Sequence, residues 1–245
     1  MGAAVGAALR TRGETVLWAS AGRSAATAER AARAGLADAG SVAELCRCCD
    51  VLISVCPPHA ALDVARSAAG FRGIYVDANA VSPATARSIG GETARFVDGG
   101  IVGPPPHEPG TTRLYLAGTE AAQVAGLFAG TTLEARVVSE APGAASAVKM
   151  AYASWTKGGA ALLLASRALA RAEGVEDTLL EEWSLSLPEL LERLPAAARS
   201  AEAKGWRWVG EMEEIAASHA AAGLPDGFHR AAAEIFRRAS SPGPE

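Results

Sequence analysis

The first 24 residues constrain the fold more than any other part of the sequence. Residues 1–9 (MGAAVGAAL) are an apolar run that favours a helix, and Thr15–Ser20 (TVLWAS) has the composition of a strand. A small polar turn, Ala21–Ser24, follows. A helix, a strand and a polar turn in this order form the second half of a nucleotide-binding βαβ unit. The first strand and leading glycines of such a unit are expected upstream of Met1, so that Met1 and Gly2 end its glycine-rich turn.

Length and composition agree with a folded protein of two unequal domains. The chain has 245 residues, of which 49% are hydrophobic and 20% charged, so it can bury a core and is not disordered. Its formal net charge of −4 offers no basic surface for nucleic acid or an anionic membrane. No apolar run reaches the about 20 residues of a membrane span, and no charged-then-apolar signal segment comes first. We expect a cytoplasmic protein that binds neither nucleic acid nor membrane.

Cysteine and lysine usage is uneven. Three of the four cysteines, Cys46, Cys48 and Cys49, lie within four residues. No second pair of cysteines or histidines stands at zinc-binding spacing, so we expect free thiols in a packed helix and neither a metal site nor a disulfide. Only three lysines accompany twenty arginines. A lysine on an apolar helix is therefore a residue to examine.

Short β-rich runs alternate with alanine-rich helical runs up to about residue 138. The runs that predict strands are Thr15–Ser20, Asp50–Val55, Gly73–Asp77, Ala94–Asp98, Arg113–Ala117 and Glu134–Val138. The runs that predict helices are Ala25–Ala34, Val42–Cys48, Ala60–Ala69, Pro83–Ile89 and Glu120–Ala129, with Ser82 and Pro83 as the cap and first residue of one of them. Apolar strands separated by helices are typical of a parallel sheet covered on both faces. The sequence therefore predicts an α/β fold with a doubly wound parallel sheet of the Rossmann type that lacks its first strand.

The pattern changes after Pro142-Gly143, where strand signals stop. Ala144–Glu173 is one helical run without proline. Later breaks are expected at Gly174, Pro188, Pro195, Gly205 and Gly223–Pro225. The prediction is a Rossmann-like domain over residues 1–141, an all-helical domain over residues 142–239 and a disordered tail over residues 240–245.

The helical half contains more apolar residues than a few helices can hide. Residues 159–238 are rich in Ala, Leu and Trp, so we expect a homodimer that forms through this half. The amphipathic segment Trp206–Glu214 is expected to pack on a helix or on a partner subunit rather than to form a site. His219 and His229 are expected to be structural.

Turns at the carboxyl ends of the strands are the predicted cofactor site, because ligands of open α/β sheets bind there. Their candidate cofactor residues are Met1, Gly2, Arg23, Ser24, Cys56, Pro57 and Asn79. Many NAD enzymes place a carboxylate after the second strand for the ribose 2′-hydroxyl, whereas an arginine and a hydroxyl suit a 2′-phosphate. No Asp or Glu occurs from Ala19 to Ala28, so NADP is favoured over NAD. A solvated arginine and ordinary strand-to-helix turns are the alternatives.

Glycines and prolines are dense just after the fourth predicted strand. Asp98-Gly99-Gly100-Ile101-Val102-Gly103 is followed by three prolines, which predicts a stiff loop with accessible backbone amides. Such amides could hold a carboxylate or an oxyanion. A plain long connection is the alternative.

Lys149 lies among small and apolar residues of the long helical run. Helical spacing places Ser146, Tyr152, Ala153 and Thr156 on its face. A partly desolvated ammonium group has a lowered pKa, as an acid/base catalyst near neutral pH requires. A snorkelling structural lysine is the alternative.

Together these residues resemble the β-hydroxyacid dehydrogenase family, which includes 3-hydroxyisobutyrate dehydrogenase, tartronate semialdehyde reductase and the 6-phosphogluconate dehydrogenases. Met1-Gly2 is similar to the end of the family's GxGxMG turn, and Phe96–Gly103 to its substrate-binding DAPVSGG loop. Pro142–Lys149 resembles the GxGxxxK signature, so the resemblance makes Lys149 the proton-transferring lysine. The helical half resembles an uncharacterised phosphogluconate-dehydrogenase-like C-terminal domain.

The sequence departs from the family in three places. Val102 stands where the family has a serine that holds the substrate carboxylate, and Tyr152-Ala153 replaces an asparagine one turn beyond the lysine. The absent first strand would leave two neighbouring strands with unpaired edges.

The resemblance implies an NADP-dependent oxidoreductase that moves hydride between nicotinamide and a small β-hydroxy acid or its semialdehyde. Lys149 would move the proton, Gly99, Gly100, Val102 and Gly103 would orient the acid group, and Tyr152 and Thr156 would line the pocket. An imine or ketone reductase is one alternative. An inactive nucleotide-binding or scaffold protein is the other.

Overall fold

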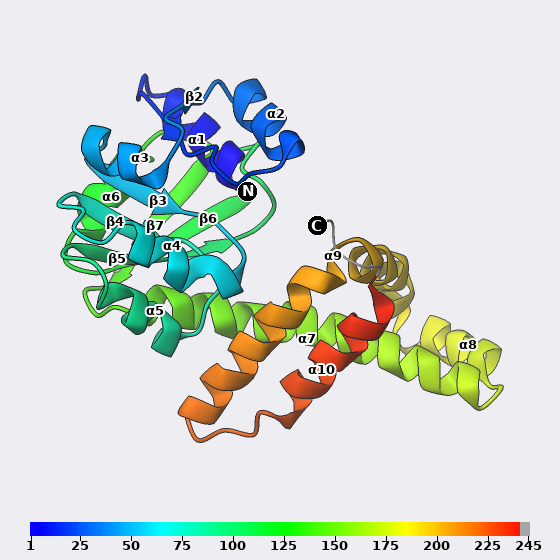
Figure 1. Ribbon diagram of the computed structural model, residues 1–245. Helices are drawn as coiled ribbons and strands as arrows, with labels where there is room; N and C mark the ends of the chain where they lie inside the picture. Colours follow the sequence, from blue (N-terminus) through cyan, green and yellow to red (C-terminus); the bar gives the residue numbers. More distant parts are fainter. Residues whose placement is uncertain (241–245) are drawn as a thin grey trace. The chain divides into compact units, whose positions relative to one another are not determined.

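The computed structural model describes residues 1–240 and divides into two compact units, Met1–Lys149 and Met150–Glu245 (Figure 1). Residues 241–245, most of the predicted tail, lie outside the described residues. The first unit contains all the strands of the described chain, and the second is helical.

A five-stranded sheet forms the centre of the first unit. Its strands, in spatial order, are β3 (Val51–Ser54), β4 (Ile74–Asp77), β5 (Phe96–Val102), β6 (Thr112–Ala117) and β7 (Leu133–Ser139). Neighbouring strands are parallel except for β5 and β6. Residues 103–111 connect that antiparallel pair, and they are too few for the crossover that a parallel pair needs. The predicted parallel sheet with covering helices is confirmed, with β6 and β7 reversed relative to the first three strands.

Helices follow the strands close to the predicted positions. They are α1 (Gly2–Arg10), α2 (Ala25–Arg33), α3 (Val42–Cys48), the 3₁₀ turn η1 (Pro58–Ala60), α4 (Ala61–Ser67), α5 (Pro83–Gly90) and α6 (Ala121–Leu127). The predicted cap of α5 is confirmed, because the Ser82 hydroxyl accepts a hydrogen bond from the Thr85 amide at 3.2 Å and Pro83 begins the helix. No helix in the described part of the chain combines the length and apolar character that a bilayer crossing needs.

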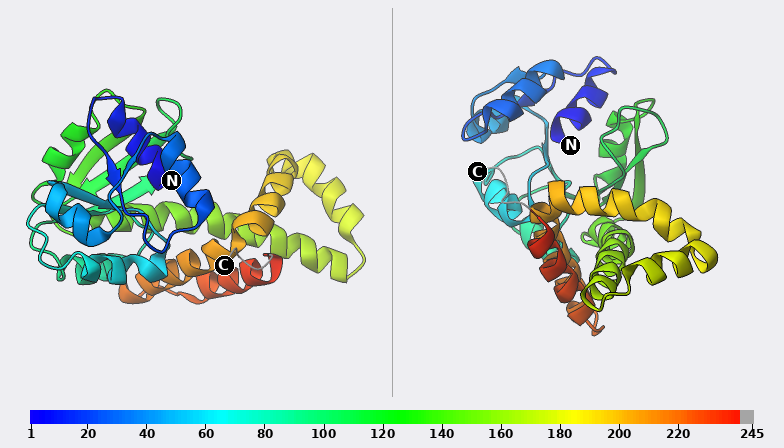
Figure 2. Two further views of the ribbon diagram at one scale, coloured as in Figure 1. Left: turned by 45° about the horizontal axis from the view of Figure 1, so that its top comes forward. Right: turned by 90° about the vertical axis from the view of Figure 1, so that its right-hand side faces the viewer.

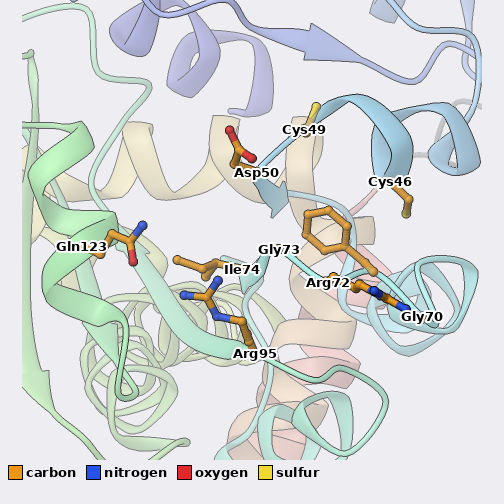
Figure 3. Close-up of a pocket in the computed structure, with 10 residues that line it drawn as sticks. Cys46, Cys49, Asp50, Gly70, Arg72, Gly73, Ile74, Arg95 and Gln123 are labelled. Carbon is orange, nitrogen blue, oxygen red and sulfur yellow. The ribbon is translucent and has the colours of Figure 1, made fainter.

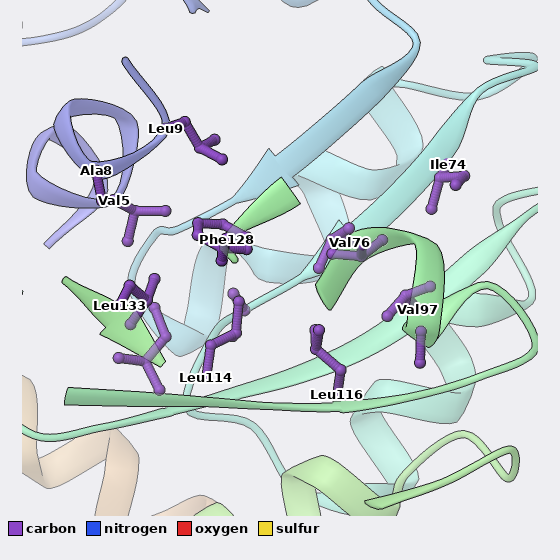
Figure 4. Close-up of a cluster of buried hydrophobic side chains, with 14 residues drawn as sticks. Val5, Ala8, Leu9, Ile74, Val76, Val97, Leu114, Leu116, Phe128 and Leu133 are labelled. Carbon is purple, nitrogen blue, oxygen red and sulfur yellow. The ribbon is translucent and has the colours of Figure 1, made fainter. Parts of the chain in front are cut away.

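Side chains from both faces of the sheet are buried, which explains the apolar strands. One cluster joins the sheet to α1 and α6 (Figure 4), and its members include Val5, Leu9, Ile74, Val76, Val97, Leu114, Leu116, Phe128 and Leu133. A second cluster covers the other face with α4 and α5, and its members include Leu52, Ala61, Ala65, Phe71, Tyr75, Ala86 and Ile89. Alternate residues of β4 enter opposite clusters, as the two-residue period of a strand requires.

A separate two-stranded parallel sheet, β1 (Leu17–Trp18) and β2 (Ala37–Asp38), precedes the main sheet in sequence. Among the described residues, β3 pairs only with β4 and β1 pairs only with β2, so each of them has an edge without a ladder partner, as expected from the sequence. The helix α1 contacts both pieces, since Gly6 lies beside Val16 and Gly2 beside Val55. The strand β2 was not predicted, because its two residues are exposed and too few to show a pattern.

The described part of the second unit is helical, as predicted. Its helices are α7 (Ala144–Ala172), which begins in the first unit, α8 (Glu176–Ser186), α9 (Pro188–Ala221) and α10 (Gly227–Ala239). The predicted breaks at Pro195 and Gly205 are wrong, because α9 continues through both and bends along its length (Figure 2). Leu194 is buried with Leu163 and Trp183, so packing outweighs the bond that Pro195 cannot donate.

Polar side chains inside the second unit are paired across its helices. Lys157 on α7 forms an ion pair with Glu211 on α9, and both side chains are largely buried. His229 on α10 shares a 2.7 Å hydrogen bond with Ser154 on α7, and its ring lies 4.2 Å from that of His219. Burial, and secondarily the charge of His219, lower the pKa of His229. These contacts agree with the structural roles expected for both histidines.

Candidate functional site

The turns at the carboxyl ends of β3 and β4 and the start of α1 come together in the first unit. A Cβ atom on Gly2 would lie 3.5 Å from Cβ of Val55, so the first residues of α1 lie against the end of β3. The Cys56 amide donates a 2.5 Å hydrogen bond to Oδ1 of Asn79. The predicted first, third and fourth turns are therefore adjacent.

Asn79 fixes the shape of this edge. It is 3% exposed, and its Nδ2 donates to Oγ of Ser54 at 3.0 Å and to Oδ1 of Asp77 at 2.5 Å. Its amide therefore joins the ends of two strands. Asn79 was predicted from the sequence and Ser54 and Asp77 were not, although a polar residue that ends an apolar strand is a usable signal.

Arg23 and Ser24, the predicted NADP-selecting residues, are exposed on the turn after β1. Ser24 is the N-cap residue of α2, and its hydroxyl lies 3.2 Å from that of Thr27. Burial raises the pKa of the Cys56 thiol, and the nearby charge of Arg23 is among the effects that oppose the rise. The guanidinium group of Arg23 therefore acts electrostatically on the third turn.

Asp38, at the end of β2, is a carboxylate near this turn that sequence analysis missed. It accepts a 2.7 Å hydrogen bond from the Gly40 amide, and this bond together with one from the Ser20 hydroxyl lowers its pKa. The segment Ala19–Ala28 has no acidic residue, but a carboxylate from elsewhere in the chain can still lie near this turn. The pairing of β1 with β2 brings Asp38 to the same edge from further along the chain.

The predicted loop at Gly99, Gly100 and Val102 is wrong, because these residues are buried within β5. A Cβ atom on Gly100 would lie 2.7 Å from the carbonyl oxygen of Ala145 and 3.0 Å from Cβ of Lys149. Glycine is needed here because α7 approaches the strand closely, not because the backbone is open. Only Gly103 is exposed, with a φ of 118° that favours glycine.

Asp98 anchors the start of α7 to β5. Its carboxylate accepts hydrogen bonds from the amides of Gly143 and Ser146, both at 2.9 Å, and from the Ser146 hydroxyl at 2.5 Å. The residue is 0% exposed. Burial raises its pKa, and the bonds from Ser146 and Gly143 oppose the rise. The carboxylate therefore caps α7 from a residue far away in sequence.

Lys149 lies one turn beyond Ser146 on α7 and is half-buried. Its Nζ donates a 2.7 Å hydrogen bond to the carbonyl oxygen of Ile101 on β5. Tyr152 and Thr156 follow on the same helix, within the second unit, and Thr156 Oγ1 donates to the Tyr152 carbonyl at 3.1 Å. In the first unit, the lysine therefore lies beside Gly100 of the predicted substrate segment.

A hollow lies at the opposite, amino-terminal edge of the main sheet (Figure 3). Its lining residues are Cys46, Cys49, Asp50, Gly70, Phe71, Arg72, Gly73, Ile74, Arg95 and Gln123. None of the predicted site residues lies there. Within residues 1–240, no group of three or more His, Cys, Asp or Glu side chains is placed to hold a metal ion, and all four cysteines are free thiols.

Comparisons with known proteins extend over the whole fold. Residues 170–239 match the family model "Domain of unknown function (DUF1932)". The structure of the conserved protein MTH1747, described as similar to 3-hydroxyacid dehydrogenases, is 31% identical, has a TM-score of 0.71, and is matched over 97% of this chain and 92% of that chain. The chain therefore combines a Rossmann-like α/β unit with the helical domain of 3-hydroxyacid dehydrogenase-like proteins. It belongs to the family that includes MTH1747.

Three further matches cover a range of identities, and two of them have named activities. The 3-hydroxyisobutyrate dehydrogenase of Mycobacterium tuberculosis, solved with L-serine, is 18% identical with a TM-score of 0.71 over 97% of this chain and 89% of that chain. A reductive aminase from Aspergillus terreus, solved with NADPH, is 21% identical with a TM-score of 0.58 over 98% of this chain and 90% of that chain. An uncharacterised 28.5 kDa protein of Methanothermus fervidus is 34% identical over 164 residues, which span 65% of this chain and 63% of that protein.

Proposed function

We propose that this chain is an NADP-dependent oxidoreductase that moves hydride between nicotinamide and a small β-hydroxy acid or its semialdehyde. The observation that carries the proposal is the position of Lys149, a half-buried amine on a helix that is anchored to the strand beside the candidate cofactor edge. The named activities of the fold relatives, a 3-hydroxyisobutyrate dehydrogenase and an NADPH-binding reductive aminase, support the same class.

The residues at the carboxyl-end edge suit a dinucleotide. The helix α1 begins at Gly2 and has no acidic residue in its first turn, which favours a pyrophosphate at that end. Met1, Cys56, Pro57 and Asn79 belong to the same edge and would contact the cofactor. A bound NADP⁺ supplies the hydride acceptor.

The protein's own contribution to the reaction is acid/base chemistry. In the oxidation, Nζ of Lys149, as the neutral amine, accepts the hydroxyl proton while the carbinol carbon loses hydride. In the reduction, the ammonium returns that proton to the oxygen. Gly103, the exposed glycine directly after β5, would orient the acid group.

A reductase for imines or ketones is the second candidate. The observation that favours it is Val102, which is 5% exposed and apolar at the position where a hydroxy-acid enzyme of the resembled family has a serine. A substrate screen separates the two candidates. Oxidation of 3-hydroxy acids with NADP⁺ supports the first, and reduction of imines with NADPH, without oxidation of hydroxy acids, supports the second.

An inactive nucleotide-binding or scaffold protein is the remaining alternative. Within the described residues, β1 and β3 each have an unpaired edge and belong to two separate sheets. NADPH binding without turnover of any substrate in the screen would favour this alternative. The cytoplasmic location stays a prediction.

Arg23→Asp is expected to reverse or abolish a preference for NADPH over NADH. The guanidinium group offers charge-assisted bonds to a 2′-phosphate, whereas a carboxylate repels the phosphate and suits a 2′-hydroxyl. Calorimetric dissociation constants for both cofactors test this. Arg72→Asp, an equal change of charge at the opposite edge of the sheet, is the control and should leave the preference intact. Equal affinities in the unmodified protein would contradict the assignment.

We further propose a homodimer that forms through the helical unit. Trp155, Leu162 and Leu169 are 72%, 54% and 65% exposed, and their seven-residue spacing places them on one face of α7. Leu162→Glu is expected to shift the molar mass measured by light scattering from dimer to monomer. Val137→Glu, on the exposed strand β7, should leave it unchanged. An unmodified protein that is monomeric at micromolar concentration excludes the dimer.

A further inference from the structure

We propose that Asp98 is a positioning residue for Lys149. Its buried carboxylate fixes the first turn of α7 against β5, and this anchor sets where the Lys149 ammonium group meets the end of the strand. The inference rests on the proposed function for its catalytic consequence. The positioning itself can be measured without any turnover.

The anchor consists of one carboxylate and three donors. Gly143, just before α7, and Ser146, in its first turn, supply two backbone amides that have no partner within the helix, and the Ser146 hydroxyl adds a third bond. A negative charge at a helix amino terminus is favourable, and more so where water is excluded. The three bonds converge on a residue that is 0% exposed, so competing water is absent.

A second hydrogen bond joins β5 and α7 three residues further along both elements. Asp98 meets Ser146, and the Ile101 carbonyl meets Lys149, so the two contacts are three residues apart on both the strand and the helix. Three residues advance about 10 Å along a strand but only about 4.5 Å along a helix. The long lysine side chain bridges that difference, so its Nζ position depends on where the first turn is held.

Gly100 lies between the two hydrogen bonds, at a point where β5 and α7 pack closely. Its Cα faces the Ala145 carbonyl and Cβ of Lys149 at distances that leave no room for another side chain. The backbone of α7 is therefore pressed on β5 between the two hydrogen-bonded points. Loss of the carboxylate anchor would let the turn that contains Ser146 move away from the strand, and Lys149 would move with it.

Asp98→Asn is the informative substitution because it keeps the size of the side chain. An amide has one acceptor oxygen, and its NH₂ group faces donors, so at least one of the three bonds is lost together with the negative charge. Ser146→Ala is the matched variant, because it removes the hydroxyl bond and keeps both amide bonds and the charge.

The direct readout is side-chain NMR of ¹⁵N-labelled lysine. The chain has only three lysines, so Lys149→Arg assigns the Lys149 resonance, and Lys157 in the other unit serves as an internal reference. We expect Asp98→Asn to shift the Lys149 resonance and to move its pH midpoint to lower pH, because the negative charge bound to Ser146, one helical turn before Lys149, is gone. The Lys157 resonance should stay in place. Ser146→Ala should change the Lys149 chemical shift by less and should leave its pH midpoint unchanged.

Steady-state kinetics tests the catalytic consequence of losing the Asp98 carboxylate. Asp98→Asn should lower kcat by about 10²-fold, the effect of a catalytic group displaced by about 1 Å, and should shift the pH–rate profile to lower pH with NADPH affinity within about twofold. Ser146→Ala should lower kcat by less than about fivefold. A purely structural Asp98 would lower the melting temperature without moving the pH profile.

The results for these variants confirm or overturn the positioning role of Asp98. An unchanged Lys149 resonance in folded Asp98→Asn, or a fall in kcat with an unmoved pH profile, overturns the proposal. If Asp98→Asn does not fold, an unchanged Lys149 resonance in Ser146→Ala overturns it. If the unmodified protein turns over no substrate, the proposed function fails while the NMR result still confirms or overturns the positioning.

Discussion

Lys149→Ala is expected to lower the turnover number by about 10²–10⁴-fold, which is the usual contribution of a positioned acid/base group. The methyl side chain cannot accept the substrate proton from the site beside β5 where Nζ now meets the Ile101 carbonyl. NADPH affinity should stay within about twofold, because the candidate cofactor residues lie on other turns. Steady-state kinetics and a cofactor titration measure the two effects.

Two lysine variants separate chemistry from structure. Lys149→Arg keeps the charge and a donor for Ile101 but does not release its proton near neutral pH, so it should be as inactive as the alanine variant. Lys204→Ala removes an exposed lysine of α9 and should be fully active. Activity of Lys149→Ala or Lys149→Arg within a few fold of the parent would remove this residue from the mechanism.

Gly100→Ala is expected to lower both stability and activity. The new Cβ atom would stand 2.7 Å from a backbone oxygen of α7, which cannot move aside as a flexible side chain could. Overpacking of this kind costs about 1–3 kcal/mol of unfolding free energy, and the forced shift of α7 should reduce turnover by about 10²-fold. Denaturant unfolding and kinetics on the same sample give the two values.

A glycine of a neighbouring helix provides the control for that experiment. Gly126 lies inside α6, and a Cβ atom added to it would meet no atom within 4 Å. Gly126→Ala should therefore raise the unfolding free energy by about 0.5–1 kcal/mol and leave activity unchanged. If Gly100→Ala behaved like Gly126→Ala, the close packing of α7 on β5 would be refuted.

Much of the fold could be predicted from local pattern. Apolar runs such as Asp50–Val55 and Gly73–Asp77 mark strands buried on both faces, and Ser82-Pro83 marks a helix start, because these signals depend on neighbours in sequence. Tertiary packing determines the parts of the fold that local sequence does not predict. Pro195 and Gly205 remain inside α9 because buried contacts around them compensate for poor helix propensity, and no local rule contains those contacts.

Local sequence also predicts some residues of the candidate site and not others. Lys149 can be identified from the sequence because a rare residue type lies on an apolar helix and in a recognisable motif. Asp98 cannot, because its partners Gly143 and Ser146 follow it by 45 and 48 residues. The glycines of β5 resemble a loop in sequence because nothing local shows that a helix will press on that strand.

We expect NADPH to bind at the carboxyl-end edge formed by the start of α1 and the turns after β1, β3 and β4. Hydrogen–deuterium exchange of the unmodified protein, with and without saturating NADPH, tests it most directly. We expect slower exchange in peptides that cover residues 2–6, 22–27, 55–60 and 78–82. Protection confined instead to the opposite edge, around Asp50, Gly73 and Arg95, or no protection at all, would contradict it.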